Sequence, residues 1–182
     1  DTPKAYEQSH IYVMPVTGGP ARRIAPGLDR DINQIEWAPD GRGVIVGYEE
    51  NGSVTIARVG LDGSVRPITH DVGGGGYDRP YAAGGFSVAK TGTVAFTVSP
   101  VDRPADVAIS SSGGIRQLTR LNELNLGGKR LATMRTLDVR APDGGSVPSW
   151  LMLPPTYQAG QRVPMILEIH GGPYSSYGPH FS

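Results

Sequence analysis

A strand–turn–strand unit that recurs along the first two thirds of the chain constrains its fold more than any other feature. Each copy has two extended runs separated by a turn with at least one glycine, and the copies are residues 11–24, 55–69 and 107–119. Two further segments, 35–46 and 86–96, join an aromatic residue to a turn and a β-rich run. Antiparallel hairpins produce this pattern, because glycine permits the tight turn between two strands.

The unit returns after roughly 45–50 residues and contains about four strands, which is typical of β-propeller blades. We therefore predict two nearly whole blades, at about residues 30–70 and 80–120, preceded by the outer half of another. Repeats of this kind bury their faces against neighbours, so we expect further blades upstream. An unrelated β-sandwich with coincidental spacing is the alternative interpretation.

The composition excludes several classes of function. The 182 residues include 17 Lys and Arg against 17 Asp and Glu, so the balanced charge gives no indication of nucleic acid or an anionic membrane as a partner. The absence of cysteine excludes disulfides and cysteine-based metal sites, and no metal-ligand spacing occurs elsewhere. The 26 glycines and 16 prolines favour short strands joined by turns over long helices.

The sequence does not identify a cellular compartment. No apolar run approaches the ~18 residues of a membrane span. The first eight residues are polar and lack an apolar signal core. We therefore expect an internal piece of a longer protein, compatible with the cytoplasm, the periplasm or secretion.

The blade pattern ends after Asn125. Residues 135–153 predict an antiparallel hairpin with an Asp-Gly turn at Asp143 and Gly144. The run Met165–Ile169 is apolar except for Glu168, which favours a strand buried on both faces of a helix-covered sheet. We therefore predict propeller blades in residues 1–125 and the start of a second domain in residues 126–182.

The apolar run breaks into His170-Gly171-Gly172-Pro173. Before it come a Gln-Leu-Thr strand end at 117–119, an Ala-Pro-Asp-Gly hairpin, and a Trp-Leu-Met-Leu-Pro-Pro strand at 150–155. In motif and order this resembles the prolyl oligopeptidase family of serine peptidases, and most closely its acylaminoacyl-peptidase and dipeptidyl-peptidase-like branch. The resemblance implies a mainly β fold, with the C-terminal blades of a β-propeller followed by the first strands of a truncated α/β-hydrolase domain.

The resemblance also implies a reaction. Members of the family hydrolyse oligopeptides or acyl-peptides through a serine acyl-enzyme, without a metal or an organic cofactor. The implied partners are the peptide substrate and the remaining segments of the same protein, and an oligomer is compatible with the sequence. The family's catalytic triad follows the His-Gly-Gly-Pro loop, whereas the nearest match here to Gly-x-Ser-x-Gly, residues 144–148, lacks the final glycine. We therefore expect none of the triad in this chain and no activity from the chain alone.

By the same resemblance, the backbone N–H of Gly172 is the oxyanion donor, in a loop shaped by His170, Gly171 and Pro173. Glycine suits this role because it lets the backbone approach the substrate without a Cβ in the way. A preorganised N–H lowers the barrier to acyl transfer by ~3–4 kcal/mol. We reject His170 as the catalytic base, since the family's base comes from a later loop.

Other side chains have two readings each. Tyr174 and Tyr177 either line the substrate pocket or pack against the propeller. Arg79 and Arg103 are either ligands for a peptide terminus or ordinary surface arginines, with the surface role as the default.

His180 has no partner that the sequence identifies, and we do not expect it to be catalytic. The aromatic residues expected in the core are Trp37, Phe86 and Trp150.

The sequence is also compatible with two alternatives to the peptidase function. One is a non-catalytic propeller of the TolB or WD-like kind, used for binding or as a scaffold, and the other is an esterase on the same fold. The junction between the apolar run and His-Gly-Gly-Pro favours the peptidase over the scaffold, which has no need of such a loop.

One hairpin and one strand cannot form a covered sheet, so we expect Met165–Ile169 to be exposed and the isolated chain to be unstable or to aggregate.

Overall fold

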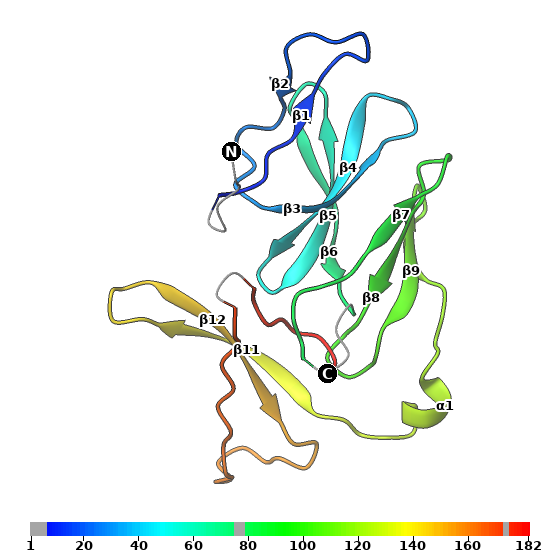
Figure 1. The fold of residues 1–182 in the computed structure, drawn as a ribbon. Coiled ribbons are helices and arrows are strands. Elements are labelled where there is room, and N and C mark those ends of the chain that lie inside the picture. The colour runs from blue at the N-terminus through cyan, green and yellow to red at the C-terminus, as the bar shows by residue number, and fades with distance from the viewer. Residues whose placement is uncertain (1–6, 75–78, 173–174) are drawn as a thin grey trace.

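The computed structural model describes residues 7–74, 79–172 and 175–182, and these residues are mainly strands (Figure 1). Two four-stranded antiparallel sheets confirm the two predicted blades. The first contains, in spatial order, β3 (Ile32–Trp37), β4 (Gly43–Glu50), β5 (Ser53–Gly60) and β6 (Val65–Val72). The second contains β7 (Phe86–Val88), β8 (Val94–Val98), β9 (Asp106–Ser111) and β10 (Gly114–Gln117). The predicted half blade is the two-stranded sheet of β1 (Tyr12–Val13) and β2 (Arg22–Arg23).

Tight turns join the strands of the first blade. Asn51 and Gly52, between β4 and β5, have φ angles of 51° and 78°, as a type I′ hairpin turn requires. Gly63, between β5 and β6, has a φ of 89°, and its N–H donates to the Gly60 carbonyl oxygen at 2.9 Å. Glycine adopts these angles without strain, which is why the glycine-containing turns predicted the hairpins correctly.

The core lies between the sheets, and the two central strands of the first blade contribute to both of its layers. Along β4, Val44 and Val46 face the layer beneath β1 and β2, whereas Ile45 between them faces the second blade. This alternation follows from the two-residue period of a strand. The layer between the blades also contains Ile56, Val72, Phe86, Val94 and Phe96.

The expected core aromatics divide. Phe86 is buried between the blades, as predicted, and Trp150 is half-buried. The prediction for Trp37 is wrong, because this residue is exposed, on the same face of β3 as Ile35. The opposite face carries Gln34 and Glu36, whose side chains bind the backbone of β7 in the next blade. On β3, the polar side chains of Gln34 and Glu36, rather than Trp37, therefore make the contacts with the next blade.

The chain changes character after the second blade. A short helix that the sequence did not predict, α1 (Glu123–Leu126), leads to the predicted hairpin of β11 (Thr133–Arg140) and β12 (Ser146–Leu153). Gly144 in its turn has a φ of 87°. The prediction of a strand at Met165–Ile169 is wrong, because residues 154–172 contain no strand. No described strand lies beside this segment to accept and donate its backbone hydrogen bonds. The expected exposure is confirmed, since Ile166 is 93% exposed.

In the part of the chain that the structure describes, no helix has the length and apolar character needed to cross a membrane.

Candidate functional site

The predicted oxyanion loop is exposed at His170, Gly171 and Gly172. The φ of Gly172 is +154°, a value that residues with a Cβ rarely adopt. Among the described residues, no backbone group accepts a hydrogen bond from the Gly172 N–H. Pro173 and Tyr174 lie outside the described residues.

His170 takes no part in a catalytic pair within the described residues. Its Nδ1 lies 2.8 Å from the carbonyl oxygen of Gly171, which can only accept a hydrogen bond. Its ring lies 5.7 Å, centroid to centroid, from the ring of Tyr177. These contacts agree with a role for His170 in shaping the loop.

Tyr177 binds the segment after the loop to the connection between the blades. It forms an isolated antiparallel bridge with Tyr81, and the two rings meet edge to face with centroids 4.8 Å apart. The backbone continues this pairing, because the Ala82 N–H donates to the Ser176 carbonyl oxygen at 2.9 Å and the Gly178 N–H donates to the Pro80 carbonyl oxygen at 2.8 Å. This geometry favours the packing role for Tyr177.

The segment before the loop is held by the same connection. The Arg79 guanidinium forms an ion pair with the Glu168 carboxylate, which also accepts a hydrogen bond from the Tyr177 hydroxyl at 3.2 Å. Burial, followed by this hydrogen bond, raises the pKa of Tyr177 above its ordinary value. Arg79 is thus neither an isolated surface arginine nor a group directed only at a substrate terminus. Tyr81 was missed, since nothing in its local sequence marks it as a partner of Tyr177.

His180 is buried at the ends of both blades, where the sequence indicated no partner. Its Nδ1 lies 3.0 Å from the carbonyl oxygen of Ser99, and its Nε2 lies 3.0 Å from that of Gly52. The hydroxyl of Ser53 is 3.5 Å from Nε2. Ser53 and His180 do not form a nucleophile and base, because their 3.5 Å separation exceeds the ~3.2 Å of such a hydrogen bond and His180 is buried away from any substrate.

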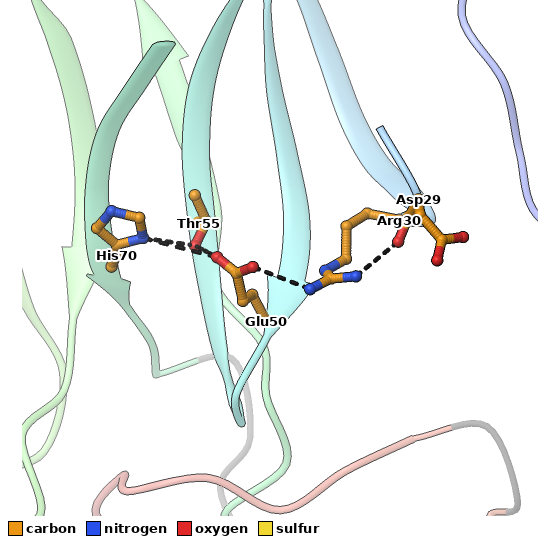
Figure 2. Close-up of polar contacts among 5 residues, drawn as sticks. All are labelled: Asp29, Arg30, Glu50, Thr55 and His70. Carbon is orange, nitrogen blue, oxygen red and sulfur yellow. Dashed lines mark hydrogen bonds and ion pairs between the residues drawn. The ribbon is translucent and has the colours of Figure 1, made fainter. Parts of the chain in front are cut away.

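A second polar cluster crosses the first blade near the β4–β5 turn (Figure 2). Glu50 accepts a hydrogen bond from Arg30 at 3.0 Å, and the Thr55 hydroxyl lies 3.5 Å from its other oxygen and 3.1 Å from His70 Nδ1. The combination of Thr, His and Glu suggests a nucleophile, but Thr55 is 1% exposed and no substrate can reach it. The cluster joins three neighbouring strands, and burial raises the pKa of the adjacent Glu49.

A third candidate is a surface hollow at the start of β9, which Arg103 and Arg120 help to line. Its buried acid, Asp106, accepts hydrogen bonds from the Thr119 hydroxyl at 2.6 Å, the Leu121 N–H at 2.9 Å and the Gln117 side chain at 3.0 Å. The carboxylate is therefore engaged in holding the end of the blade. Within the described residues, no group of three or more His, Cys, Asp or Glu side chains is placed to hold a metal ion.

Comparison with known proteins finds similarity to peptidases. No protein-family model matches the chain. It is 25% identical over 175 residues to dipeptidyl-peptidase 5 of Porphyromonas gingivalis, covering 94% of this chain and 24% of that protein. It is 28% identical over 145 residues to the uncharacterized peptidase YuxL of Bacillus subtilis, covering 78% and 21%.

Among solved structures, Pyrococcus horikoshii acylaminoacyl peptidase superposes with a TM-score of 0.75 and 26% identity, over 98% of this chain and 26% of that one. The chain therefore spans about a quarter of the length of the relatives that it matches. The described residues are mainly strands, and they superpose on part of acylaminoacyl peptidase, an enzyme that combines a propeller with a hydrolase domain. These similarities to dipeptidyl-peptidase 5, peptidase YuxL and acylaminoacyl peptidase support a relationship to peptidases of the prolyl oligopeptidase family.

Proposed function

We propose that this chain is part of a serine peptidase that hydrolyses oligopeptides or acyl-peptides through an acyl-enzyme. Residues 1–125 supply propeller blades and residues 126–182 supply the start of the hydrolase domain. The observation that carries the proposal is the exposed residue Gly172, which follows His170 and Gly171 in a loop whose two flanks are bound to the connection between the blades. The similarity to peptidases over nearly the whole chain supports it.

In the proposed reaction, a serine oxygen from outside this chain attacks the carbonyl carbon of the scissile bond. A carbon–oxygen bond forms, and the π electrons of the carbonyl move to its oxygen. The Gly172 N–H donates a hydrogen bond to this oxyanion. Collapse of the intermediate breaks the carbon–nitrogen bond, and the amine leaves with the proton that a base outside this chain took from the serine hydroxyl. Water then hydrolyses the acyl-enzyme that remains. Loop placement matters because such a donor accelerates the reaction only where the negative charge develops.

The test uses the complete gene product with a fluorophosphonate probe, which labels activated serines, and with acyl-peptide p-nitroanilides as substrates. We expect labelling and hydrolysis. Gly172→Ala is expected to lower kcat by about 100-fold, because an added Cβ at this φ moves the donor away from the oxyanion.

Gly92→Ala is the matched control, since Gly92 also has a positive φ, of 86°, but lies in the β7–β8 turn with open space around it. It is expected to leave kcat unchanged. A product that neither labels nor hydrolyses would favour the scaffold function, and cleavage of esters without cleavage of peptides would favour the esterase. Equal kcat in the Gly172→Ala variant and the wild type would remove Gly172 from the oxyanion site.

A further inference from the structure

The imidazole of His180 joins three connections that are far apart in the chain. It reaches the β8–β9 connection through Ser99, the β4–β5 turn through Gly52 and the β6–β7 connection through Gly73, against which its ring packs. The residue is 8% exposed, so these contacts are made away from solvent. Figure 1 shows the C-terminal segment next to the ends of both blades, where these connections meet.

Both polar contacts of His180 require the ring to donate a hydrogen. Both partners are carbonyl oxygens, which can only accept, so each ring nitrogen has to donate in order to bond. A neutral imidazole makes one of the two bonds, and an imidazolium makes both. Removing the donors would leave two carbonyl oxygens unpaired at a buried site, which costs more than a typical exposed hydrogen bond.

Glycines allow the His180 ring and its segment to pack closely against the blades. A Cβ on Gly73 would come within 2.4 Å of His180 Nδ1, although the backbone angle of Gly73 is not one that requires glycine. A Cβ on Gly178 would come within 1.6 Å of the Gly52 carbonyl oxygen. At both positions a side chain would clash where the C-terminal segment packs against the ends of the blades. Glycine at these positions therefore allows this close packing.

From His180 the connection runs back to the oxyanion loop. Gly178 and Ser176 are hydrogen-bonded to Pro80 and Ala82, and Tyr177 between them packs on Tyr81. Only a few residues separate this pairing from Gly172. We propose that His180 is a positioning residue, which fastens the segment behind the loop to the ends of both blades and so sets the position of the Gly172 N–H. The role of Gly172 in this proposal rests on the proposed function.

Three variants of the complete gene product separate the parts of this contact. His180→Phe keeps the ring and removes both donors, whereas Asn and Gln at this position each keep one donor, near the place of Nδ1 and Nε2 respectively. We expect His180→Phe to lower kcat at least about tenfold with KM within about twofold, since the buried ring no longer donates to either carbonyl oxygen. The Asn and Gln variants are expected to lie between Phe and the wild type.

The exposed His70 gives a matched control, because His70→Phe makes the same substitution outside this contact. It is expected to leave kcat unchanged. All rates are normalised to the number of sites that the fluorophosphonate labels, so that unfolded protein is not counted. Affinity for a peptide aldehyde, whose adduct places an oxygen in the oxyanion hole, is expected to fall in His180→Phe by the same factor as kcat. A purely structural role would not move this affinity.

A second readout does not depend on activity. The amides of Ala82 and Gly178 are expected to exchange with solvent about tenfold faster in His180→Phe, because the segment that protects them is released. Unchanged exchange and unchanged normalised kcat would overturn the proposal while leaving the peptidase function intact. Faster exchange in a product without peptidase activity would instead support the fastening contact and contradict the proposed function.

Discussion

The two blades and the segment after β12 contain similar apolar residues, but they bury them very differently. Ile56, in the central strand β5, is fully buried between the blades. Ile166, in the run before the oxyanion loop, is almost fully exposed, and Leu167 next to it is exposed as well. Hydrophobicity alone therefore does not decide which isoleucine enters the core.

The difference comes from where the partners of each strand lie. Strand β5 follows β4 after a two-residue turn, so hydrogen-bonding partners are available within a few residues. Met165–Ile169 has no described strand beside it, and the segment is held instead through the contacts of Glu168 with Arg79 and Tyr177. Pairing between neighbouring strands allows each blade to bury its apolar side chains. The position of the loop region, in contrast, depends on a few polar contacts with residues that are distant in the chain.

The largest expected effect contrasts the two isoleucines. Ile56→Ala is expected to destabilise the protein by about 3 kcal/mol, because it leaves a cavity in the layer between the blades. Ile166→Ala makes the same chemical change at an exposed position and is expected to stay within about 0.5 kcal/mol of the wild type. Urea unfolding of the 182-residue chain, at a concentration low enough to prevent aggregation, measures both. Equal losses would show that residue 166 is buried in solution.

The next effect concerns a buried acid. Asp106→Ala is expected to cost about 2 kcal/mol, because it leaves the donors of Thr119, Leu121 and Gln117 without their acceptor. Asp143→Ala, in the exposed β11–β12 turn, also removes a hydrogen bond, from the Gly145 N–H, and is expected to cost less than about 1 kcal/mol. The same urea titration gives the ranking, and the reverse order would contradict it.

The exposed apolar run predicts the behaviour of the isolated 182-residue chain. We expect it to aggregate, because an apolar segment with an unpaired backbone can pair with another copy. Replacing Ile166 and Leu167 with lysine is expected to raise the soluble fraction, as measured by light scattering, while Gln161→Lys adds charge outside the run and is expected to do less. A soluble wild-type monomer that melts cooperatively would disprove this expectation.

The smallest expected effect lies on the surface of the first blade. The hydrogen bond from Arg58, then the backbone N–H of Arg42, lowers the pKa of Asp40 below its ordinary value of 3.8. Since the folded pKa is the lower one, this pair contributes to stability above the ordinary Asp value and loses that contribution as the pH falls through the folded pKa. Arg58→Ala is expected to raise the pKa of Asp40, as measured by NMR titration. Arg116→Ala, on exposed β10, is expected to leave it unchanged.

Much of the blade architecture follows from local sequence. The turn at Gly63 predicted the pairing of β5 with β6, because a hairpin depends on neighbouring residues. Trp37 was assigned wrongly to the core, since the sequence does not show which face of β3 meets the next blade. The proposed donor, Gly172, follows from its motif, whereas Tyr81 and Arg79 could not be paired with the loop from sequence.

The sequence by itself determined the repeated hairpins, the change of pattern after Asn125 and the loop that carries Gly172, because each is encoded in residues that are close together in the chain. Only the tertiary structure decided what holds that loop. The contacts of His180 with Ser99 and Gly52 join residues separated by 81 and 128 positions. No local pattern records such contacts, since they exist only after the blades have folded and brought their connecting turns together.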